Sequence, residues 1–332
     1  MAQAVRLSIP QALALCQAAA SAAGARPETA RSLAMASVTA QAEGQTPVGL
    51  SHFVDYLDAL RAGRIDGQAW PQIARPARPF FHVDARGGTA HLGFDLAFDD
   101  LVTTARDLGV AVFSQRNAFT CGALGYFVRR LAEQGLVALA ATNGPALMAG
   151  SGGARPVFCT NPVAFAAPRA DGPPLVIDQA SSAAAFVAIR AAAERGEPIP
   201  ADWALDAAGR PTTDAAEALK GVLLAAGGPR GANIALMVEV LAAGLTGANW
   251  SLDAPSFLAG SQSPGSGLFI LALEPKLLDP GFEQRMARQL GRLAHAFGVY
   301  IPGARKAAMR QQAEDDGIWT DTDTLGRISP AR

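Results

Sequence analysis

Residues 44–65 read Gly44-Gln45-Thr46-Pro47-Val48-Gly49-Leu50-Ser51-His52-Phe53-Val54-Asp55-Tyr56-Leu57-Asp58-Ala59-Leu60-Arg61-Ala62-Gly63-Arg64-Ile65. We interpret this stretch as a helix that lines a functional site and ends in the glycine-containing turn at residues 60–65. If Val48 and His52 lie on one helix, they share a face, because residues four apart are neighbours on a helix surface. The stretch is then expected to present an apolar side chain and an imidazole side by side.

The composition is that of a globular protein with a large core. The chain has 332 residues, of which 50% are hydrophobic and 17% charged, enough for one elaborate domain or for two to three smaller ones. A formal net charge of -1 provides no positive surface for nucleic acid or for an anionic membrane. Small molecules and other protein chains remain as the expected partners.

We expect neither export nor membrane insertion from this sequence. Residues 1–9 lack a basic region followed by an apolar one, and the longest apolar runs are interrupted well short of a membrane span. The three cysteines, Cys16, Cys121 and Cys159, are too few and too scattered for a disulfide framework or a structural zinc cluster. These features favour a cytoplasmic location.

Helical patterns alternate with short apolar strands along the chain. Ser8 is a candidate N-cap for a first helix that carries Pro10 in its first turn, and further helices are expected at residues 27–42, 97–108, 123–134, 183–194, 232–245 and 282–297. Strands are expected at residues 80–84, 110–113, 136–141, 163–167, 175–178 and 267–273, and a loop at 196–214. This alternation predicts an α/β or α+β class.

Several common site motifs are absent from the sequence. No Gly-x-Gly-x-x-Gly follows a strand and no phosphate-binding P-loop occurs, which disfavours a Rossmann or P-loop fold. The histidines lie at positions 52, 82, 91 and 295, none paired at helical metal-ligand spacing, so no metal site is expected. Ser51 and His52 are adjacent, but no nucleophile-elbow pattern surrounds them, and acyl transfer stays a secondary alternative.

Four further segments carry a family resemblance. They are Val157-Phe158-Cys159-Thr160-Asn161-Pro162, Asp178-Gln179-Ala180-Ser181-Ser182, Gly227-Gly228-Pro229-Arg230-Gly231 and Pro302-Gly303-Ala304-Arg305-Lys306. Together with residues 44–65, they make most of the chain similar to the type 2 malate/L-lactate dehydrogenase family. In that family a Ser-His-Gly triplet stands where this chain has Pro47-Val48-Gly49.

The resemblance implies a nicotinamide-dependent reductase fold distinct from Rossmann, with a largely antiparallel central sheet and flanking helical domains, usually in a homodimer. It suggests an N-terminal helical part of a substrate and dimer domain at residues 1–75. A cofactor-binding sheet domain with inserted helices would follow at 76–275. A C-terminal helix and tail that pack back on the N-terminal part would occupy 276–332.

The resemblance also implies residue roles. Asp178 and His52 are the candidate catalytic residues, and Thr160, His52 and Val48 are the candidate substrate contacts. The candidate cofactor contacts are Thr120, Cys121, Gly122, Ala123, Leu124, Asp178, Gln179, Ala180, Arg230, Gly231, Pro302, Gly303, Arg305 and Lys306. The implied cofactor is NADPH or NADH, with NADPH favoured, and the known substrates of the family are small 2-oxo acids and cyclic imino acids.

The departures from the family pattern fall on positions that carry its chemistry. Val48 and Thr120 replace histidines, His52 replaces an arginine and Arg230 replaces a lysine. Drift in an inactive homologue that only binds a cofactor or a carboxylate is one explanation, and a changed substrate is the other. Reduction of a 2-oxo acid needs a proton donor, whereas a cyclic iminium already carries its proton.

These departures predict reduction of an imine such as Δ1-piperideine-2-carboxylate or Δ1-pyrroline-2-carboxylate. The alternative within the enzyme class is a malate- or lactate-type dehydrogenase in which His52 serves as the acid.

Overall fold

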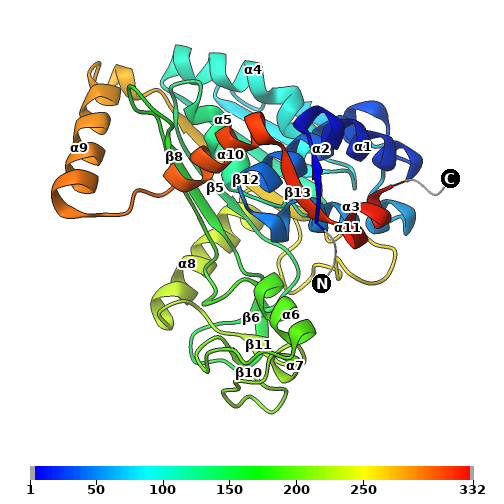
Figure 1. The fold of residues 1–332 in the computed structure, drawn as a ribbon. Helices are drawn as coiled ribbons and strands as arrows, with labels where there is room; N and C mark the ends of the chain where they lie inside the picture. Colours follow the sequence, from blue (N-terminus) through cyan, green and yellow to red (C-terminus); the bar gives the residue numbers. More distant parts are fainter. Residues whose placement is uncertain (1–3, 330–332) are drawn as a thin grey trace.

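A seven-stranded sheet forms the centre of the computed structural model, which describes residues 4–329 (Figure 1). In spatial order its strands are β2 (Gln72–Ala74), β3 (Phe80–Asp84), β4 (Val110–Ala118), β12 (Ser266–Leu273), β5 (Val137–Thr142), β8 (Val163–Ala167) and β9 (Leu175–Gln179). Only β3 and β4 pair in parallel within it. The prediction of a mixed class with a largely antiparallel central sheet is therefore confirmed.

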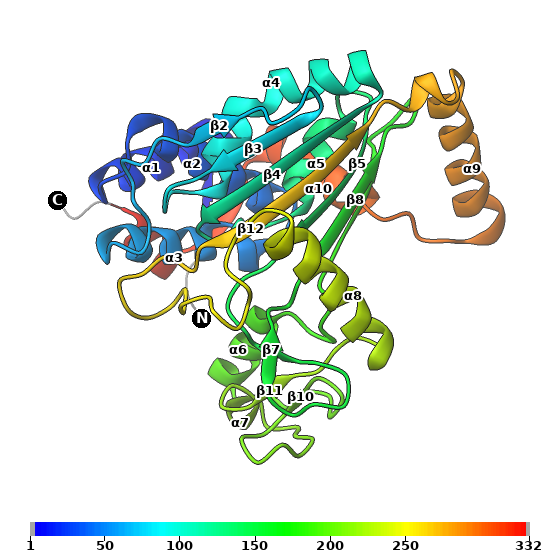
Figure 2. The ribbon, with the colours of Figure 1, turned by 180° about the vertical axis from the view of Figure 1, so that it is seen from behind.

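Alternation along the strands separates two packed faces. In β5, Ala138 and Ala140 face the core below α4 (Ala90–Leu108) and α5 (Gly125–Ala132), whereas Ala141 packs against α8 (Pro229–Glu239). This period of two is what a strand covered on both faces requires. Figure 2 shows the sheet from behind with α8 running across it.

A helical part flanks one end of the sheet. It contains α1 (Ile9–Ala22), α2 (Pro27–Ala42) and α3 (Leu50–Arg61). The expected cap is present: the Gln11 backbone N–H donates to Ser8 Oγ at 3.3 Å, and the Ser8 backbone N–H donates to Gln11 Oε1 at 2.9 Å. Large apolar side chains of α2 and α3 fill its core.

The end of the chain returns to this helical part. β13 (Ile318–Asp321) follows α10 (Ala304–Asp316) and precedes α11 (Thr322–Ile328) in the sequence. It pairs antiparallel with β1 (Ala4–Leu7). Side chains of these three elements join the core of the N-terminal helices, and Figure 1 shows the two coloured ends side by side. The numerical domain bounds at residues 75 and 275 stay a prediction.

A smaller lobe projects from the large sheet. It is formed by the segment between β5 and β8 and by the segment that follows β9. Its four-stranded sheet has the order β10 (Ala204–Leu205), β11 (Val222–Leu223), β6 (Met148–Ala149) and β7 (Pro156–Phe158), and it carries α6 (Phe186–Arg195) and α7 (Ala215–Ala218). The expectation of a plain loop at 196–214 is wrong, because β10 and a bridge between Pro198 and Asp214 lie within it.

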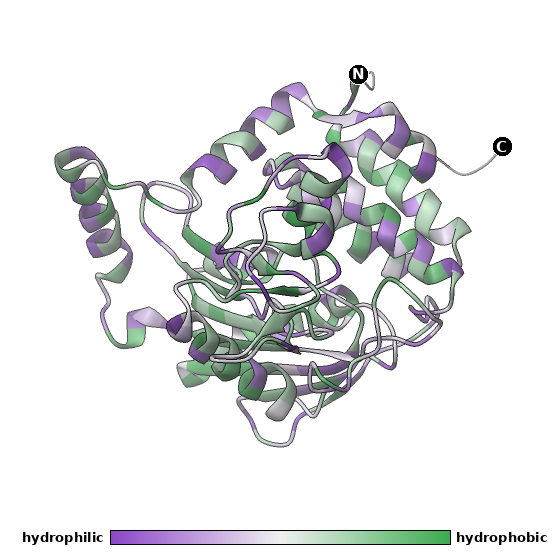
Figure 3. Ribbon diagram, turned by 90° about the horizontal axis from the view of Figure 1, so that it is seen from below, coloured by the Kyte–Doolittle hydropathy of each residue, from purple (hydrophilic) through white to green (hydrophobic). Residues whose placement is uncertain are grey.

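Two helices leave apolar side chains exposed. In α9 (Phe282–Phe297) only Leu290 is buried, and Figures 1 and 2 both show this helix standing away from the body. α8 continues into a π-helical turn (Val240–Gly244), so the single helix expected at 232–245 begins earlier and changes its winding. Figure 3 shows hydrophobic and hydrophilic residues interspersed along α9.

Other boundaries differ from expectation because tertiary contacts set them. The helix expected at 97–108 begins at Ala90, the one at 123–134 spans Gly125–Ala132, and the one at 183–194 spans Phe186–Arg195. The strand expected at 110–113 extends to Ala118, because it pairs with β12 along most of its length. None of the helices at residues 4–329 combines the length and apolar composition needed to cross a bilayer.

The helix at the centre of residues 44–65 starts later than predicted. Val48 ends a 3-10 turn (Thr46–Val48), and α3 begins at Leu50 after the bent backbone of Gly49. The turn fits tightly against α2, since a Cβ at Gly49 would lie 3.1 Å from the Gln41 Cα. Gln41 Oε1 in turn accepts the Leu50 N–H at 3.0 Å. Val48 and His52 therefore do not share one helix.

Candidate active site

A cavity of about 200 Å³ lies between α3, the loop after β4, the segment around Thr160 and α6. It collects residues from distant parts of the sequence. The sequence-predicted residues that line it are Val48, His52, Thr120, Cys121, Gly122, Thr160 and Ala180. Apolar side chains, among them Leu147, Phe186, Val187 and Phe257, form most of the remaining wall.

His52 is held by its own helix. Its Nδ1 lies 2.9 Å from Asp55 Oδ2, and its ring meets the Tyr56 ring edge-on at 4.6 Å between centroids. Burial opposes ionisation of Asp55, but the hydrogen bond and charge of His52 and the charge of Arg190 outweigh it, so the pKa of Asp55 lies below its usual range. An ionised carboxylate only accepts, so Nδ1 donates its proton and Nε2 is left for other partners.

Arg190 is a cation of the cavity that motif reasoning missed. It lies on α6, and its Nη2 is 3.7 Å from Asp55 Oδ2. It lies about one helical turn into α6, which begins at Phe186 after the Asp178–Ser182 motif, and it belongs to none of the motifs that carry the family resemblance. Only the packing of the small lobe against α3 brings it to the cavity. The sequence alone offered the weak signal of a charged residue in an Ala-rich helix.

Asp178 lies beside the cavity and is not among its lining residues. Its Oδ2 accepts the Gly125 N–H at 2.8 Å, where α5 begins behind the loop at residues 120–124. Burial raises the pKa of Asp178, and the Gly125 hydrogen bond and the charge of Lys306 offset this only in part. A nearby cation would therefore shift this carboxyl group toward its ionised form.

The Thr160 segment is fixed by a buried polar network. Asn161 Nδ2 donates to Glu239 Oε2 at 2.7 Å and to the Ala235 carbonyl at 2.9 Å. Glu239 also accepts the Ser251 N–H at 2.6 Å and the Ser251 hydroxyl at 2.8 Å. Asn161 has a φ of 35°, in the left-handed region that asparagine tolerates. The network thereby fixes Thr160 at the cavity wall.

The loop at residues 120–124 has one unpartnered polar atom. Thr120 Oγ1 is buried and has no hydrogen-bond partner within residues 4–329, although Thr120 lines the cavity. The Thr120 carbonyl accepts the Tyr56 hydroxyl at 3.2 Å, and the Cys121 carbonyl lies 3.0 Å from His91 Nε2. Burial lowers the pKa of His91 to about 4, so this histidine is neutral and its Nε2–H donates to the loop. Ala123 and Leu124, at the end of the same loop, do not line this cavity.

The C-terminal turn lines a second cavity of about 620 Å³. Gly303 and Lys306 line it, and Pro302 joins it to the sheet because its carbonyl accepts the Val176 N–H at 3.3 Å. Lys306 Nζ donates to Gln45 Oε1 at 3.0 Å, just before the 3-10 turn that carries Val48. Arg305, by contrast, is exposed on α10.

The remaining predicted contacts lie elsewhere. Arg230 is exposed at the start of α8, and Gln179 is exposed at the end of β9. Gly231 is buried, and a Cβ at this position would overlap the Ala226 carbonyl. The close approach of the two backbone segments therefore explains why a glycine stands here. The roles of all these residues stay predictions. Within residues 4–329, no three His, Cys, Asp or Glu side chains gather as a metal site would require.

Comparison with known proteins identifies the family. A family model described as malate/L-lactate dehydrogenase matches residues 7–329. A (2R)-3-sulfolactate dehydrogenase (NADP(+)) of Chromohalobacter salexigens is 38% identical over 92% of this chain and 92% of its own length. A Δ1-pyrroline-2-carboxylate/Δ1-piperideine-2-carboxylate reductase of Pseudomonas putida is 37% identical over 95% of this chain and 93% of its own.

The solved structures agree with the sequence comparison. The crystal structure of Δ1-piperideine-2-carboxylate reductase from Pseudomonas syringae pv. tomato matches with a TM-score of 0.93 at 36% identity, covering 98% of this chain and 99% of that one. The chain belongs to the malate/L-lactate dehydrogenase family of nicotinamide-dependent oxidoreductases.

Replacing the buried acid of the Thr160 network tests its importance. We expect Glu239→Ala to lower the free energy of unfolding by about 3 kcal/mol, because the Asn161 amide and both Ser251 donors lose their acceptor in a buried place. Urea denaturation measures this change. Glu194→Ala, on the exposed side of α6, is the control and should change stability by no more than about 0.5 kcal/mol. A loss below about 1 kcal/mol in Glu239→Ala would contradict the importance of the network.

Proposed function

We propose that this protein reduces a cyclic imine carboxylate of the Δ1-pyrroline-2-carboxylate or Δ1-piperideine-2-carboxylate type to the cyclic amino acid, with NADPH or NADH as reductant. The observation that carries the proposal is Val48, an apolar side chain on the cavity wall where the family pattern has its proton-donating histidine. The similarity to proteins named as reductases of these two imines supports it.

The chemistry of the substrate explains how Val48 is tolerated. Reduction of a 2-oxo acid creates an alkoxide that must be protonated, and a positioned acid contributes roughly 10²- to 10⁴-fold to that step. A cyclic iminium carries its proton on nitrogen before the hydride arrives, and its product is an amine. Such a substrate is cationic at the reacting centre, so it gains from a nearby anion. Asp178, beside the cavity, supplies a carboxyl group that a cation would hold in its ionised form.

The residues present fit a nicotinamide cofactor. The Thr120 hydroxyl, buried at the wall without a partner within residues 4–329, is suited to hydrogen-bond a bound group there. The second cavity has a volume suited to a nucleotide, and Lys306 on its wall suits a phosphate group, because its described partner is the neutral Gln45 side chain. Arg129 and Arg310 also line it, but both are paired there with Glu133. The cofactor supplies the hydride when bound. The similarity to an enzyme named for NADP(+) supports a preference for NADPH.

A second candidate is a 2-hydroxy acid dehydrogenase in which His52 is the acid. One specific observation favours it: Asp55 binds His52 Nδ1 and leaves Nε2 free at a cavity wall. The similarity to a sulfolactate dehydrogenase points in the same direction. In this case His52 acts as an imidazolium, gives its Nε2 proton to the alkoxide and keeps the Nδ1 proton that it shares with Asp55.

A cofactor-oxidation screen separates the two candidates. We expect kcat/KM for the two cyclic imines to exceed that for pyruvate, oxaloacetate and 3-sulfopyruvate by about 10²-fold, because only the oxo acids need a proton donor. Turnover of oxo acids without turnover of either imine would reject the imine proposal. Abolition of that turnover in His52→Ala, with cofactor binding retained, would support the second candidate. Cofactor binding without turnover of any compound would point to an inactive homologue.

Substitution of Asp178 tests its electrostatic role. We expect Asp178→Asn to lower kcat for the imine on the order of 10²-fold, since the carboxylate near the cationic substrate is lost. Its stability at neutral pH should not fall. Burial raises the pKa of Asp178, so the folded state is penalised above that pKa, and the neutral amide removes the penalty while still accepting the Gly125 N–H. An unchanged kcat, or a destabilised variant, would contradict this role.

The assembly is proposed to be a homodimer. Leu236, Met237 and Leu245, in and just after α8, are 53%, 50% and 60% exposed, and Leu278 and Phe297 next to and within α9 are 86% and 64% exposed. Several large apolar side chains exposed on one helix, as on α8, are typical of a surface that binds another chain. We expect light scattering to give the mass of a dimer and Met237→Glu to shift it toward the monomer, while Thr103→Glu on exposed α4 leaves it unchanged. A monomeric wild type at micromolar concentration would contradict the proposal.

A cytoplasmic location is proposed as well. Its support is the presence of three free cysteines in the structure and the dependence on a nicotinamide cofactor.

A further inference from the structure

We infer that Arg190 binds the carboxylate of the substrate, that Asp55 positions its guanidinium, and that the cavity thereby selects monocarboxylates over dianions. This rests on the proposed function only in assuming that the ligand is a small carboxylate. The family pattern gives the carboxylate-binding role to an arginine at position 52, which is a histidine here.

Arg190 is the source of positive charge in the cavity. Among the lining residues of the described chain it is the only lysine or arginine. Its side chain is 32% exposed, and it forms no hydrogen bond with another residue of 4–329. The 3.7 Å to Asp55 Oδ2 makes an ion pair that is too long for a hydrogen bond. The planar fork of N–H donors therefore stays available for a carboxylate.

His52 cannot substitute for this arginine. Its Nδ1–H is committed to Asp55 at 2.9 Å, so the imidazole offers a single nitrogen to the cavity. Two parallel hydrogen bonds to one carboxylate need the geometry of a guanidinium. Asp55 thus restrains both groups: it binds the imidazole directly and keeps the guanidinium beside the cavity through its charge.

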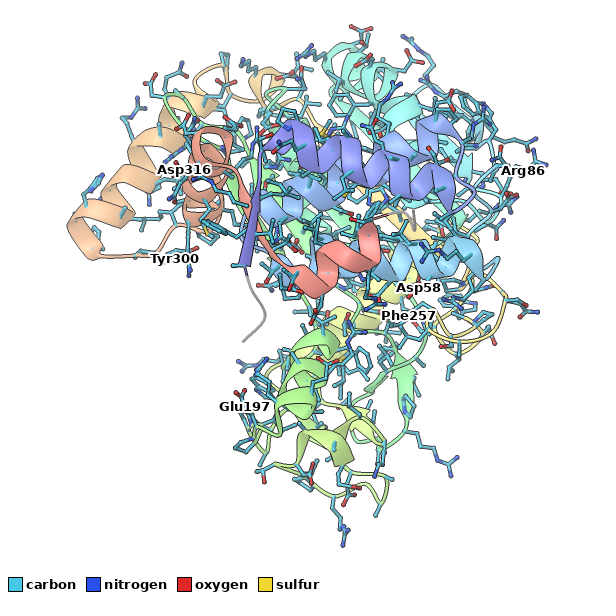
Figure 4. The ribbon with its side chains drawn as sticks, turned by 45° about the vertical axis from the view of Figure 1, so that its right-hand side comes forward. Asp58, Arg86, Glu197, Phe257, Tyr300 and Asp316 are labelled. Carbon is cyan, nitrogen blue, oxygen red and sulfur yellow. The ribbon has the colours of Figure 1, made fainter. Side chains whose placement is uncertain are left out.

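The rest of the wall selects the part of the ligand that is attached to the carboxylate. Phe186 and Val187 precede Arg190 on α6, and the rings of Phe186 and Phe257 lie 6.4 Å apart at 88°. Figure 4 shows Phe257 between the helical part that carries Asp58 and the lobe that carries Glu197. An apolar ring fits such walls. A second anionic group would find no further lysine or arginine in the lining of the described chain and would meet the charge of Asp55, which disfavours malate- and sulfolactate-type dianions.

Substitutions of Arg190 test the assignment with a matched control. The probes are pyrrole-2-carboxylate, a planar monocarboxylate that cannot be reduced in the same way, and its neutral amide, pyrrole-2-carboxamide, both measured by calorimetry with NADP(+) present. We expect Arg190→Gln to weaken carboxylate binding about 10²-fold and to abolish the preference for the acid over the amide. The affinity of Arg190→Lys for the carboxylate should lie between those of the wild type and Arg190→Gln, because lysine keeps the charge and loses the planar fork of donors.

The control is Arg195→Gln on the same helix. Arg195 is 58% exposed and pairs with Glu197 at 2.7 Å, outside the cavity, so neither ligand binding nor NADP(+) binding should change. Asp55→Asn should weaken carboxylate binding several-fold. It should also raise the kcat/KM for oxaloacetate relative to that for pyruvate. An acid preference that survives in Arg190→Gln would overturn the assignment, and unchanged selectivity in Asp55→Asn would overturn the part given to Asp55.

The outcomes separate this inference from the proposed function. If the wild type binds pyrrole-2-carboxylate through Arg190 but reduces neither cyclic imine, the proposed function fails and the assignment of Arg190 stands. If the wild type reduces the imines and Arg190→Gln keeps its KM within about twofold, the assignment fails and the proposed function stands.

Discussion

The buried carboxylate of Glu239 is the contact on which the arrangement of the site depends. It is 4% exposed and accepts from Asn161 Nδ2 and from two donors of Ser251, so it joins the Thr160 segment, α8 and the chain before β12. A buried charge is tolerated only when hydrogen bonds replace its water, and three donors do so here.

Two other carboxyl groups near the cavity are shifted in opposite directions. Asp55 is buried, yet the hydrogen bond of His52 and the nearby Arg190 lower its pKa, so it is ionised at neutral pH and lies beside both side chains. For Asp178 burial dominates, and its pKa is raised. An acid in that state responds to the charge of a ligand bound beside it. Groups whose pKa values are driven apart in one site can divide the chemical roles between them. Under the proposed function, Asp55 positions Arg190 and Asp178 responds to the cationic substrate.

The local parts of the fold were predictable and the contacts across it were not. Periodicity located β3, α2 and α9 to the residue, because each pattern is complete within its own segment. Motifs placed Thr160 and Ala180 at the cavity, whereas the bent backbone of Gly49 separated Val48 from the helix of His52. Arg190 was missed because its neighbour Asp55 lies far away in sequence, and only the packing of the lobe brings them together.

Sequence identity does not choose between the chemistries of the relatives. An enzyme named for sulfolactate is 38% identical and one named for the cyclic imines is 37% identical, a difference without meaning over chains of this length. The charges in the cavity discriminate better. A dianion needs two positive partners, and the lining of the described chain provides one, which already faces Asp55. A monocarboxylate with an apolar ring needs one cation and apolar walls. The same count makes the absence of an arginine at position 52 compatible with the inferred carboxylate binding, since α6 supplies the one arginine in the lining of the described chain.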